Sequence, residues 1–142
     1  MIAIDTNVLV YANREEFPRH RDALRRLTVL AEGPAPWGIP VFCLGEFLRV
    51  VTHPRVLDPP STLEEALAFL AALSGSPSYR CLLPDAAFSN ALAAVSREGA
   101  ATGNLMFDAQ TAAVCRVNGA TLLTEDRDFS RFGIATERLA AG

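Results

Sequence analysis

Residues 2–9 of the chain read Ile2-Ala3-Ile4-Asp5-Thr6-Asn7-Val8-Leu9, and this stretch decides the fold class. The three apolar residues make a run of the length expected of a short buried strand, which Asp5 ends. Asp, Thr and Asn are favoured at the starts of helices, so residues 7–12 are expected to form one or two helical turns. A strand that passes directly into a helix is a unit of an α/β fold.

The same order of strand and helix continues along the chain. Further strands are expected at residues 38–41, 79–83 and 120–123, with a last short one at 133–135, and residues 137–142 are expected to fray. Helices with one apolar face are expected at 18–32, 43–52 and 105–117. Ser61 and Glu64 predict a capping box for another helix, and Pro84 is expected in the first turn of one that ends at Gly99. The alternation predicts an α/β fold with a mainly parallel sheet and helices on both faces.

Length and composition are those expected of one globular domain over residues 1–142, with half of the residues hydrophobic and one fifth charged. No apolar run is long enough to span a bilayer, and the N-terminus lacks the pattern of a secretory signal, so a cytoplasmic location is expected. The cysteines are odd in number and form no CxxC pair. We expect them to be buried free thiols: Cys43, Cys81 and Cys115.

The formal net charge of −3 taken alone disfavours a nucleic-acid partner, but its distribution reverses that inference. All 13 basic residues are Arg, against 16 acids. If four acids hold a cation, 12 acids face 13 Arg, a balance of +1.

Four acids are expected to meet at one end of the sheet: Asp5, Glu46, Asp108 and Asp126. Asp5 follows the first strand, and Glu46 lies about one turn into the helix after the second. From Asp108 a helix descends roughly 15 Å, and the strand before Asp126 climbs back roughly 17 Å. The two paths nearly cancel, which returns both side chains to the carboxyl end of the strands, where α/β folds bind ligands.

Carboxylates so close together repel one another unless a cation or a proton neutralises them. Mg²⁺ and Mn²⁺ prefer oxygen ligands, and a metal-bound water is a stronger nucleophile towards a phosphodiester. His20 and His53 have no partner at metal-ligand spacing, so Zn²⁺ is not expected.

At these residues the sequence resembles the PIN-domain family, specifically the VapC-type toxins of toxin–antitoxin pairs. The matching segments lie in the family's order across nearly the whole chain: Ile4-Asp5-Thr6-Asn7-Val8-Leu9, Gly45-Glu46-Phe47, Phe107-Asp108-Ala109 with Ala112-Ala113, and Leu123-Thr124-Glu125-Asp126-Arg127-Asp128-Phe129. Two features depart from this subgroup. Gln110 stands where His is frequent, and the tail after Ile134 is short and lacks an aromatic residue.

The resemblance implies an α/β/α sandwich and an Mg²⁺- or Mn²⁺-dependent endoribonuclease that leaves a 5′-phosphate and a 3′-hydroxyl. It also implies a homodimer and inhibition by a cognate antitoxin of the VapB type. Asp5 and Asp108 match the direct metal ligands, Asp126 an additional one, and Glu46 the acid that completes the pocket. The residues that match supporting positions are Thr6, Asn7, Thr124 and Asp128.

Simpler interpretations remain open. Asp5 is also a good helix cap, Glu46 could be a solvated helix residue, and Asp126 and Asp128 also suit a turn. Asp108 lies among Met106, Phe107 and Ala109 in the sequence, where an unpaired charge would be costly. One group of arginines either forms a solvated surface or contacts RNA or the antitoxin: Arg19, Arg25, Arg26 and Arg55.

Two other functions are alternatives to the nuclease. A phosphatase or phosphotransfer domain also places an Asp after its first strand, but it usually needs a second Asp two residues on or a Lys near the pocket. Asn7 occupies that position and the chain contains no Lys. A non-catalytic module that binds RNA or protein on the same fold is the remaining alternative.

Overall fold

The apolar run at the N-terminus forms β1 (Ile2–Ile4), the central strand of a five-stranded sheet in the computed structural model, which describes residues 1–140. The strand order is β3-β2-β1-β4-β5, and each neighbouring pair is parallel. The other strands are β2 (Trp37–Pro40), β3 (Tyr79–Leu82), β4 (Thr121–Leu123) and β5 (Thr136–Glu137). The predicted parallel α/β sheet is confirmed.

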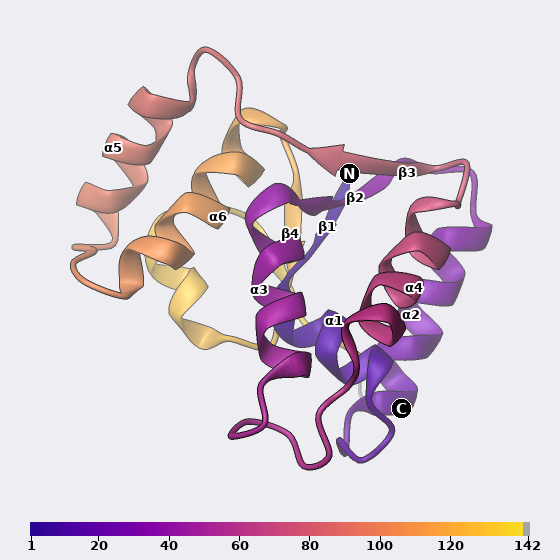
Figure 1. Cartoon of the computed structure of the whole chain (residues 1–142). Helices are drawn as coiled ribbons and strands as arrows, with labels where there is room; N and C mark the ends of the chain where they lie inside the picture. Colours follow the sequence, from indigo (N-terminus) through magenta and orange to yellow (C-terminus); the bar gives the residue numbers. More distant parts are fainter. Residues whose placement is uncertain (141–142) are drawn as a thin grey trace.

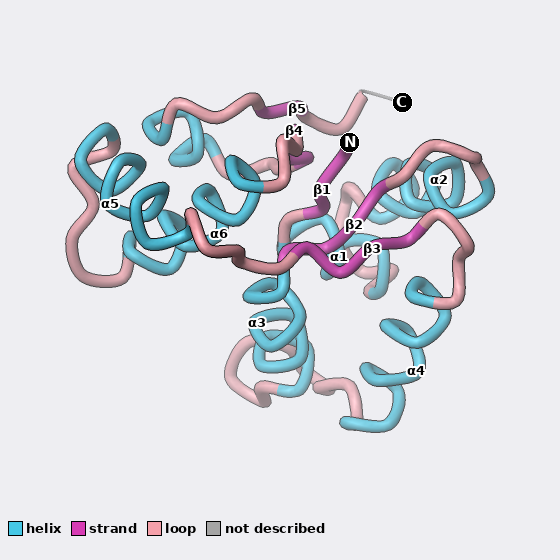
Figure 2. The backbone as a smooth tube through the Cα atoms, turned by 90° about the horizontal axis from the view of Figure 1, so that it is seen from above, coloured by secondary structure: helices cyan, strands magenta, loops and turns pink. Residues whose placement is uncertain are grey.

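Helices cover both faces of the sheet, which gives the three layers (Figures 1 and 2). Successive strand residues point to opposite faces, so Ile4 and Leu123 pack in one apolar core while Ala3 and Leu122 pack in the other. The first core is shared with α1 (Thr6–Asn13), α2 (His20–Glu32), α3 (Val41–Thr52) and α4 (Leu63–Ser74). The second is shared with α5 (Phe88–Glu98), α6 (Leu105–Val117) and the 3-10 helix η1 (Arg127–Phe132).

The register of the two central strands fixes which residues meet beyond their ends. Ile4 pairs with Leu123, and the Asp5 N–H donates to the Leu123 carbonyl at 3.1 Å. The next residues, Asp5 and Thr124, therefore leave the sheet side by side at its carboxyl edge.

Two predicted helix starts are wrong. The capping box is formed by Thr62 and Glu65 rather than by Ser61 and Glu64, because Ser61 is engaged elsewhere. Its N–H donates to the Val51 carbonyl at 2.7 Å, and its hydroxyl accepts from Arg14 at 2.9 Å.

Pro84 is not in the first turn of α5, which begins four residues later at Phe88 after a turn held by the Asp85 carboxylate. That carboxylate accepts the Ala87 N–H at 2.8 Å.

The C-terminal segment also differs from its prediction. Gly133 has a positive φ of 63°, so the chain turns there and β5 starts at Thr136 instead of Gly133. Thr124 N–H donates to the Glu137 carbonyl at 2.9 Å, and Leu139 is buried. The expected fraying is therefore wrong for residues 137–140, and residues 141 and 142 lie outside the described residues.

The cysteines divide into two classes. Cys43 and Cys115 are buried free thiols as expected, but Cys81 is exposed because β3 is an edge strand. Across residues 1–140, none of the helices combines the length and the apolar character that a membrane crossing requires.

Candidate metal site

Asp5 is held by hydrogen bonds to both of its carboxylate oxygens. Its Oδ1 accepts the Thr6 N–H at 2.8 Å, which caps α1, and its Oδ2 accepts the Thr124 hydroxyl at 2.7 Å. Only 7% of the residue is exposed. Asp5 therefore caps a helix, as the simpler interpretation held, and also projects among the other acids.

Burial and neighbouring charge work against ionisation of Asp5. Its pKa is raised from 3.8 to about 6, chiefly by burial and further by the charges of Glu46 and Asp126. The hydrogen bonds from Thr124 and Thr6 act in the opposite direction, because they stabilise the carboxylate. In the absence of a cation, Asp5 is therefore still half protonated at about pH 6.

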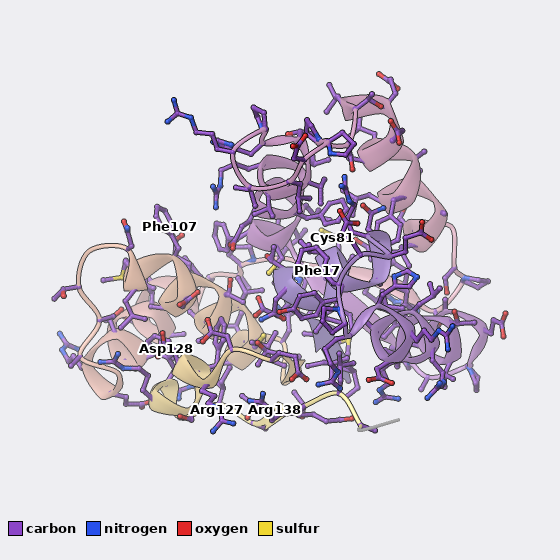
Figure 3. The ribbon with its side chains drawn as sticks, turned by 90° about the horizontal axis from the view of Figure 1, so that it is seen from below. Phe17, Cys81, Phe107, Arg127, Asp128 and Arg138 are labelled. Atoms are coloured by element: carbon purple, nitrogen blue, oxygen red, sulfur yellow. The ribbon has the colours of Figure 1, made fainter. Side chains whose placement is uncertain are left out.

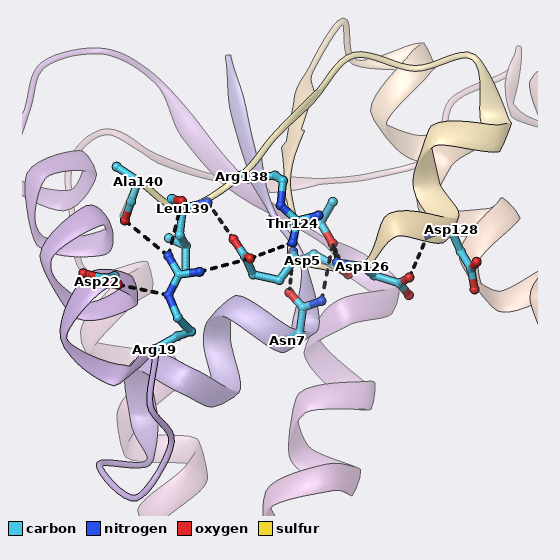
Figure 4. A network of polar contacts seen from close by, with 11 residues as sticks. Asp5, Asn7, Arg19, Asp22, Thr124, Asp126, Asp128, Arg138, Leu139 and Ala140 are labelled. Atoms are coloured by element: carbon cyan, nitrogen blue, oxygen red, sulfur yellow. Dashed lines mark hydrogen bonds and ion pairs between the residues drawn. The ribbon is translucent and has the colours of Figure 1, made fainter. Parts of the chain in front are cut away.

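Three other acids come together across α6 and η1. Asp108, Asp126 and Asp128 each offer a carboxylate oxygen, and these oxygens lie within 4.8 Å of one another. The Asp126 carboxylate accepts the Asp128 N–H at 2.9 Å at the start of η1 (Figure 4), and this bond holds the two acids in fixed relation. The sequence placed Asp108 and Asp126 at the same level, and the fold brings them together.

Ionisation of Asp108 is disfavoured by its burial and by the neighbouring carboxylates. Its pKa is raised from 3.8 to about 7, first by burial and then by the charges of Asp126, Asp5, Glu46 and Asp128. All five carboxylates thus act on one region, with Glu46 on the facing side of α3. Of the four acids expected from the sequence, Asp108 and Asp126 cluster with Asp128, while the charges of Asp5 and Glu46 act on Asp108 from nearby.

Polar side chains brace this arrangement. The Thr124 hydroxyl also accepts the Asp126 N–H at 3.0 Å, so one side chain links the ends of β1 and β4. Asn7 donates to Thr124 at 3.4 Å and accepts the Glu125 N–H at 3.4 Å (Figure 4). These contacts give Asn7 and Thr124 a positioning part, whereas the Thr6 hydroxyl is buried without a hydrogen-bond partner in the described residues.

The donor set fits a hard divalent cation. Its ligand atoms are carboxylate oxygens, and their mutual repulsion would be relieved by positive charge. The Cys43 thiol lies 3.7 Å from Asp5 Oδ1, but burial raises its pKa well above the usual value and keeps it protonated. A soft metal would need the thiolate, so Mg²⁺ or Mn²⁺ suits these residues better than Zn²⁺.

Most of the arginines singled out from the sequence are engaged in ion pairs. Arg19 pairs with Asp22 at 3.0 Å and Glu125 at 3.2 Å, and Arg26 pairs with Glu137 at 3.2 Å. Arg25 lies at the longer distance of 3.9 Å from Asp22, and its side chain is 65% exposed. Arg55 is exposed and forms no ion pair within residues 1–140.

Beside the acids runs a groove that the sequence did not reveal. This α3–α6 groove has a volume of about 720 Å³ and is lined by Phe42, Gly45, Glu46, Arg49, Asn104, Phe107, Asp108 and Gln110. On the other side of the acids, a notch of about 310 Å³ is lined by Thr124, Asp126, Arg127, Ser130, Thr136 and Arg138. A larger hollow between residues 13–21 and 59–65 contains none of the clustered acids.

The α3–α6 groove was not expected from the sequence because the exposure of Phe107 was not foreseen. In the sequence, Phe107 is identified only as an apolar neighbour of Asp108, but 64% of Phe107 is exposed (Figure 3). The helical period gave no signal for this exposure, because Thr111 and Val114, one and two turns further along α6, are both buried.

Comparison with known proteins gives a consistent result. The family model of the PIN domain matches residues 2–135. The VapC ribonuclease Mb2897 of Mycobacterium bovis is 37% identical over 132 residues, which cover 93% of this chain and 90% of that relative. Ribonuclease VapC31 of Mycobacterium tuberculosis is 32% identical and covers 93% of each chain.

Solved structures share the same fold. VapBC2 from Rickettsia felis, bound to a DNA fragment from its promoter, has a TM-score of 0.72 at 20% identity and covers 99% of this chain and 100% of that chain. VapC20 of Mycobacterium tuberculosis, a sarcin-ricin-loop-cleaving toxin, has a TM-score of 0.68 at 23% identity and covers 95% and 97%. At these identities the likeness establishes the fold alone.

Proposed function

This chain belongs to the PIN domain family and, within it, to the VapC ribonucleases, and from that premise we propose that it is the toxin of a type II toxin–antitoxin pair. In this proposal it is an endoribonuclease that hydrolyses RNA phosphodiester bonds and depends on Mg²⁺ or Mn²⁺. The observation that carries the proposal is the convergence of Asp108, Asp126 and Asp128, with Asp5 and Glu46 close enough to raise the pKa of Asp108.

Asp5, Asp108 and Asp126 would hold the cation, and Glu46 would complete the pocket. The bound cation would supply an activated water and positive charge for the scissile phosphate. Thr124 keeps Asp5 and Asp126 in register through its hydroxyl. Glu46 would accept a proton from the attacking water, and cleavage would leave a 5′-phosphate and a 3′-hydroxyl. Asp128, at the edge of the cluster, would support Asp126.

Family membership also supports partners for this chain. Several solved relatives with this fold are toxin–antitoxin complexes, among them the VapBC assemblies of Rickettsia felis and Salmonella typhimurium. By that analogy we propose a cognate VapB-type antitoxin and a homodimer. Because the proposed substrate is cellular RNA, the proposal places its action in the cytoplasm. That residues 1–142 form one domain remains a prediction.

The test is cleavage of total cellular RNA by the purified protein, free of antitoxin, in Mn²⁺ or Mg²⁺, with the new 5′ ends sequenced. Asp5→Asn should abolish the cuts while the protein stays folded, and EDTA should abolish them too. Asp85→Asn is the matched control because Asp85 is an exposed acid of the β3–α5 loop, outside the cluster. Asp85→Asn should cut like the wild type.

The outcomes separate the candidate functions. Cuts that persist in Asp5→Asn or in EDTA would contradict the proposed metal nuclease. Binding of Mn²⁺ without any new 5′ ends would favour a module that binds RNA or protein on a PIN fold.

A further inference from the structure

The α3–α6 groove is continuous with the candidate metal site, because Glu46 and Asp108 belong to both. A molecule in this groove would therefore lie directly beside the bond that the acids act on. The volume of about 720 Å³ is ample for one nucleotide and too small for a folded partner.

Phe107 gives the groove an aromatic surface. It is the most exposed large hydrophobic residue in the described part of the chain, at 64%. Its neighbour Asp108 on α6 points to the acids, so the ring lies one residue away from the cluster. An exposed ring at such a place offers a flat face to a nucleobase, and stacking of this kind tolerates any base.

Three polar side chains of the groove have no polar partner among the described residues. Across residues 1–140, Arg49 makes no ion pair, and the side chains of Asn104 and Gln110 make no hydrogen bonds. Arg49 can bind a phosphate, and the two amides carry both donors and acceptors for the edge of a base. Aromatic face, cation and amides together match the chemistry of a nucleotide.

The notch on the far side of the acids could hold the RNA strand beyond the α3–α6 groove. In Figure 3 Phe107 lies on one side of Asp128, and Arg127 and Arg138 lie on the other. Arg127 makes no ion pair in the described residues, while Arg138 pairs with Glu125 at 3.0 Å. A strand laid across the acids would thus meet an aromatic ring before them and positive charge after them.

We propose that the α3–α6 groove binds one unpaired nucleotide of the RNA next to the scissile phosphate, with its base stacked on Phe107 and its phosphate contacted by Arg49. This inference rests on the proposed function, since it assumes that RNA crosses the acids. A base inside a helix keeps its neighbours stacked on both faces, so the groove selects single strands and loops.

The test is direct binding of short single-stranded RNAs that carry 2-aminopurine, whose fluorescence is quenched by stacking. Binding is measured in Ca²⁺ instead of Mn²⁺, and intact RNA is verified afterwards on a gel. The proteins are the wild type, Phe107→Tyr, which keeps the ring, and Phe107→Leu, which keeps an apolar side chain without one. Leu63→Ala is the matched control, because Leu63 is 55% exposed on α4 and lies outside the groove.

Wild type, Phe107→Tyr and Leu63→Ala should bind and quench alike, whereas Phe107→Leu should bind roughly ten-fold more weakly and lose the quenching. Arg49→Gln should weaken binding and reduce its salt dependence, while Arg97→Gln on α5 should not. Equal binding and quenching by Phe107→Leu would overturn the proposal. So would equal affinity for single-stranded and duplex RNA, and so would a groove that binds peptides but no RNA.

Cleavage of total RNA is scored separately. Quenching that requires Phe107, without any cutting by the wild type, would support the groove and contradict the nuclease. Cutting at unchanged sites and rates in Phe107→Leu would support the nuclease and overturn the groove.

Discussion

Thr124→Val tests the positioning of the acids most sharply. The Thr124 side chain is buried, and its hydroxyl donates to Asp5 Oδ2 at 2.7 Å and accepts the Asp126 N–H at 3.0 Å. Valine keeps the shape but loses both contacts, together with the longer 3.4 Å hydrogen bond that Asn7 donates to the Thr124 hydroxyl. A hydrogen bond to a charged group contributes about 1.5–3 kcal/mol and one to a backbone N–H about 1 kcal/mol, so we expect the free energy of unfolding to fall by about 2.5–4 kcal/mol.

The decrease in the free energy of unfolding caused by Thr124→Val should be larger at high pH than at low pH. The pKa of Asp5 in the folded protein is about 6, above its ordinary 3.8, so ionisation of Asp5 removes stability as pH rises through that window. The Thr124 hydrogen bond lowers this pKa, and its removal raises the pKa further. The destabilisation by Thr124→Val should therefore be larger at about pH 8 than at about pH 5.

Urea unfolding in EDTA at the two pH values measures both effects. Thr121→Val is the matched control, because Thr121 lies on β4, the strand that Thr124 directly follows, and its side chain forms no hydrogen bond within the described part of the chain. Thr124→Ser should recover most of the stability, since it restores the hydroxyl. A loss no larger than that of Thr121→Val, or one that is equal at both pH values, would refute this account of Thr124.

Two further predictions follow from the same geometry. In thermal unfolding, the rise in Tm caused by Mn²⁺ should be small at about pH 5 and large at about pH 8. Asp5 and Asp108, with pKa values of about 6 and about 7, must lose their protons to bind the cation. A rise in Tm that is independent of pH would contradict this. In urea unfolding, Gly38→Ala should destabilise the protein by about 1–3 kcal/mol, because the added Cβ would collide with the Arg80 carbonyl in the neighbouring strand. Gly45→Ala should instead stabilise the protein by up to about 1 kcal/mol, because its Cβ would lie in open space on α3.

The sequence predicted the centre of the fold because local signals there agree. The run Ile2–Ile4 has the length of a buried strand, and the parallel order follows from helices placed between strands. The convergence of Asp108 and Asp126 was predictable from the lengths of α6 and β4 alone, since a descending helix and an ascending strand cover nearly equal distances.

The errors fall where long-range contacts decide between similar local patterns. Ser61 and Thr62 are both good caps, and the contacts of Ser61 with Arg14 and Val51 leave Thr62 to cap α4. Nothing local distinguishes a frayed tail from β5, which forms because Thr124 and Leu122 offer unpaired backbone N–H groups at the edge of β4.

The arginines at the start of α2 can either stabilise the fold or bind a partner, and the sequence pattern does not distinguish these roles. Arg19 was a candidate for RNA or antitoxin binding, but its guanidinium contacts Asp22, Glu125 and the carbonyls of Leu139 and Ala140 (Figure 4). Glu125 also accepts the Leu139 N–H at 2.7 Å and immediately precedes Asp126. Arg19 therefore ties the C-terminal segment to the loop that carries a metal-site acid.

Arg19→Gln should accordingly lower the free energy of unfolding by about 1–3 kcal/mol, as expected for lost hydrogen bonds to a charged group. Arg25→Gln is the comparison, since Arg25 lies on α2, which Arg19 directly precedes, is 65% exposed and lies 3.9 Å from Asp22. It should leave the free energy of unfolding within about 0.5 kcal/mol of the wild type. RNA affinity separates the two purposes. If Arg25→Gln weakens RNA binding while Arg19→Gln weakens it only in proportion to the loss of folded protein, then Arg25 contacts RNA and Arg19 acts through the C-terminal segment. Full stability in Arg19→Gln with weakened RNA binding would return Arg19 to the RNA-binding surface.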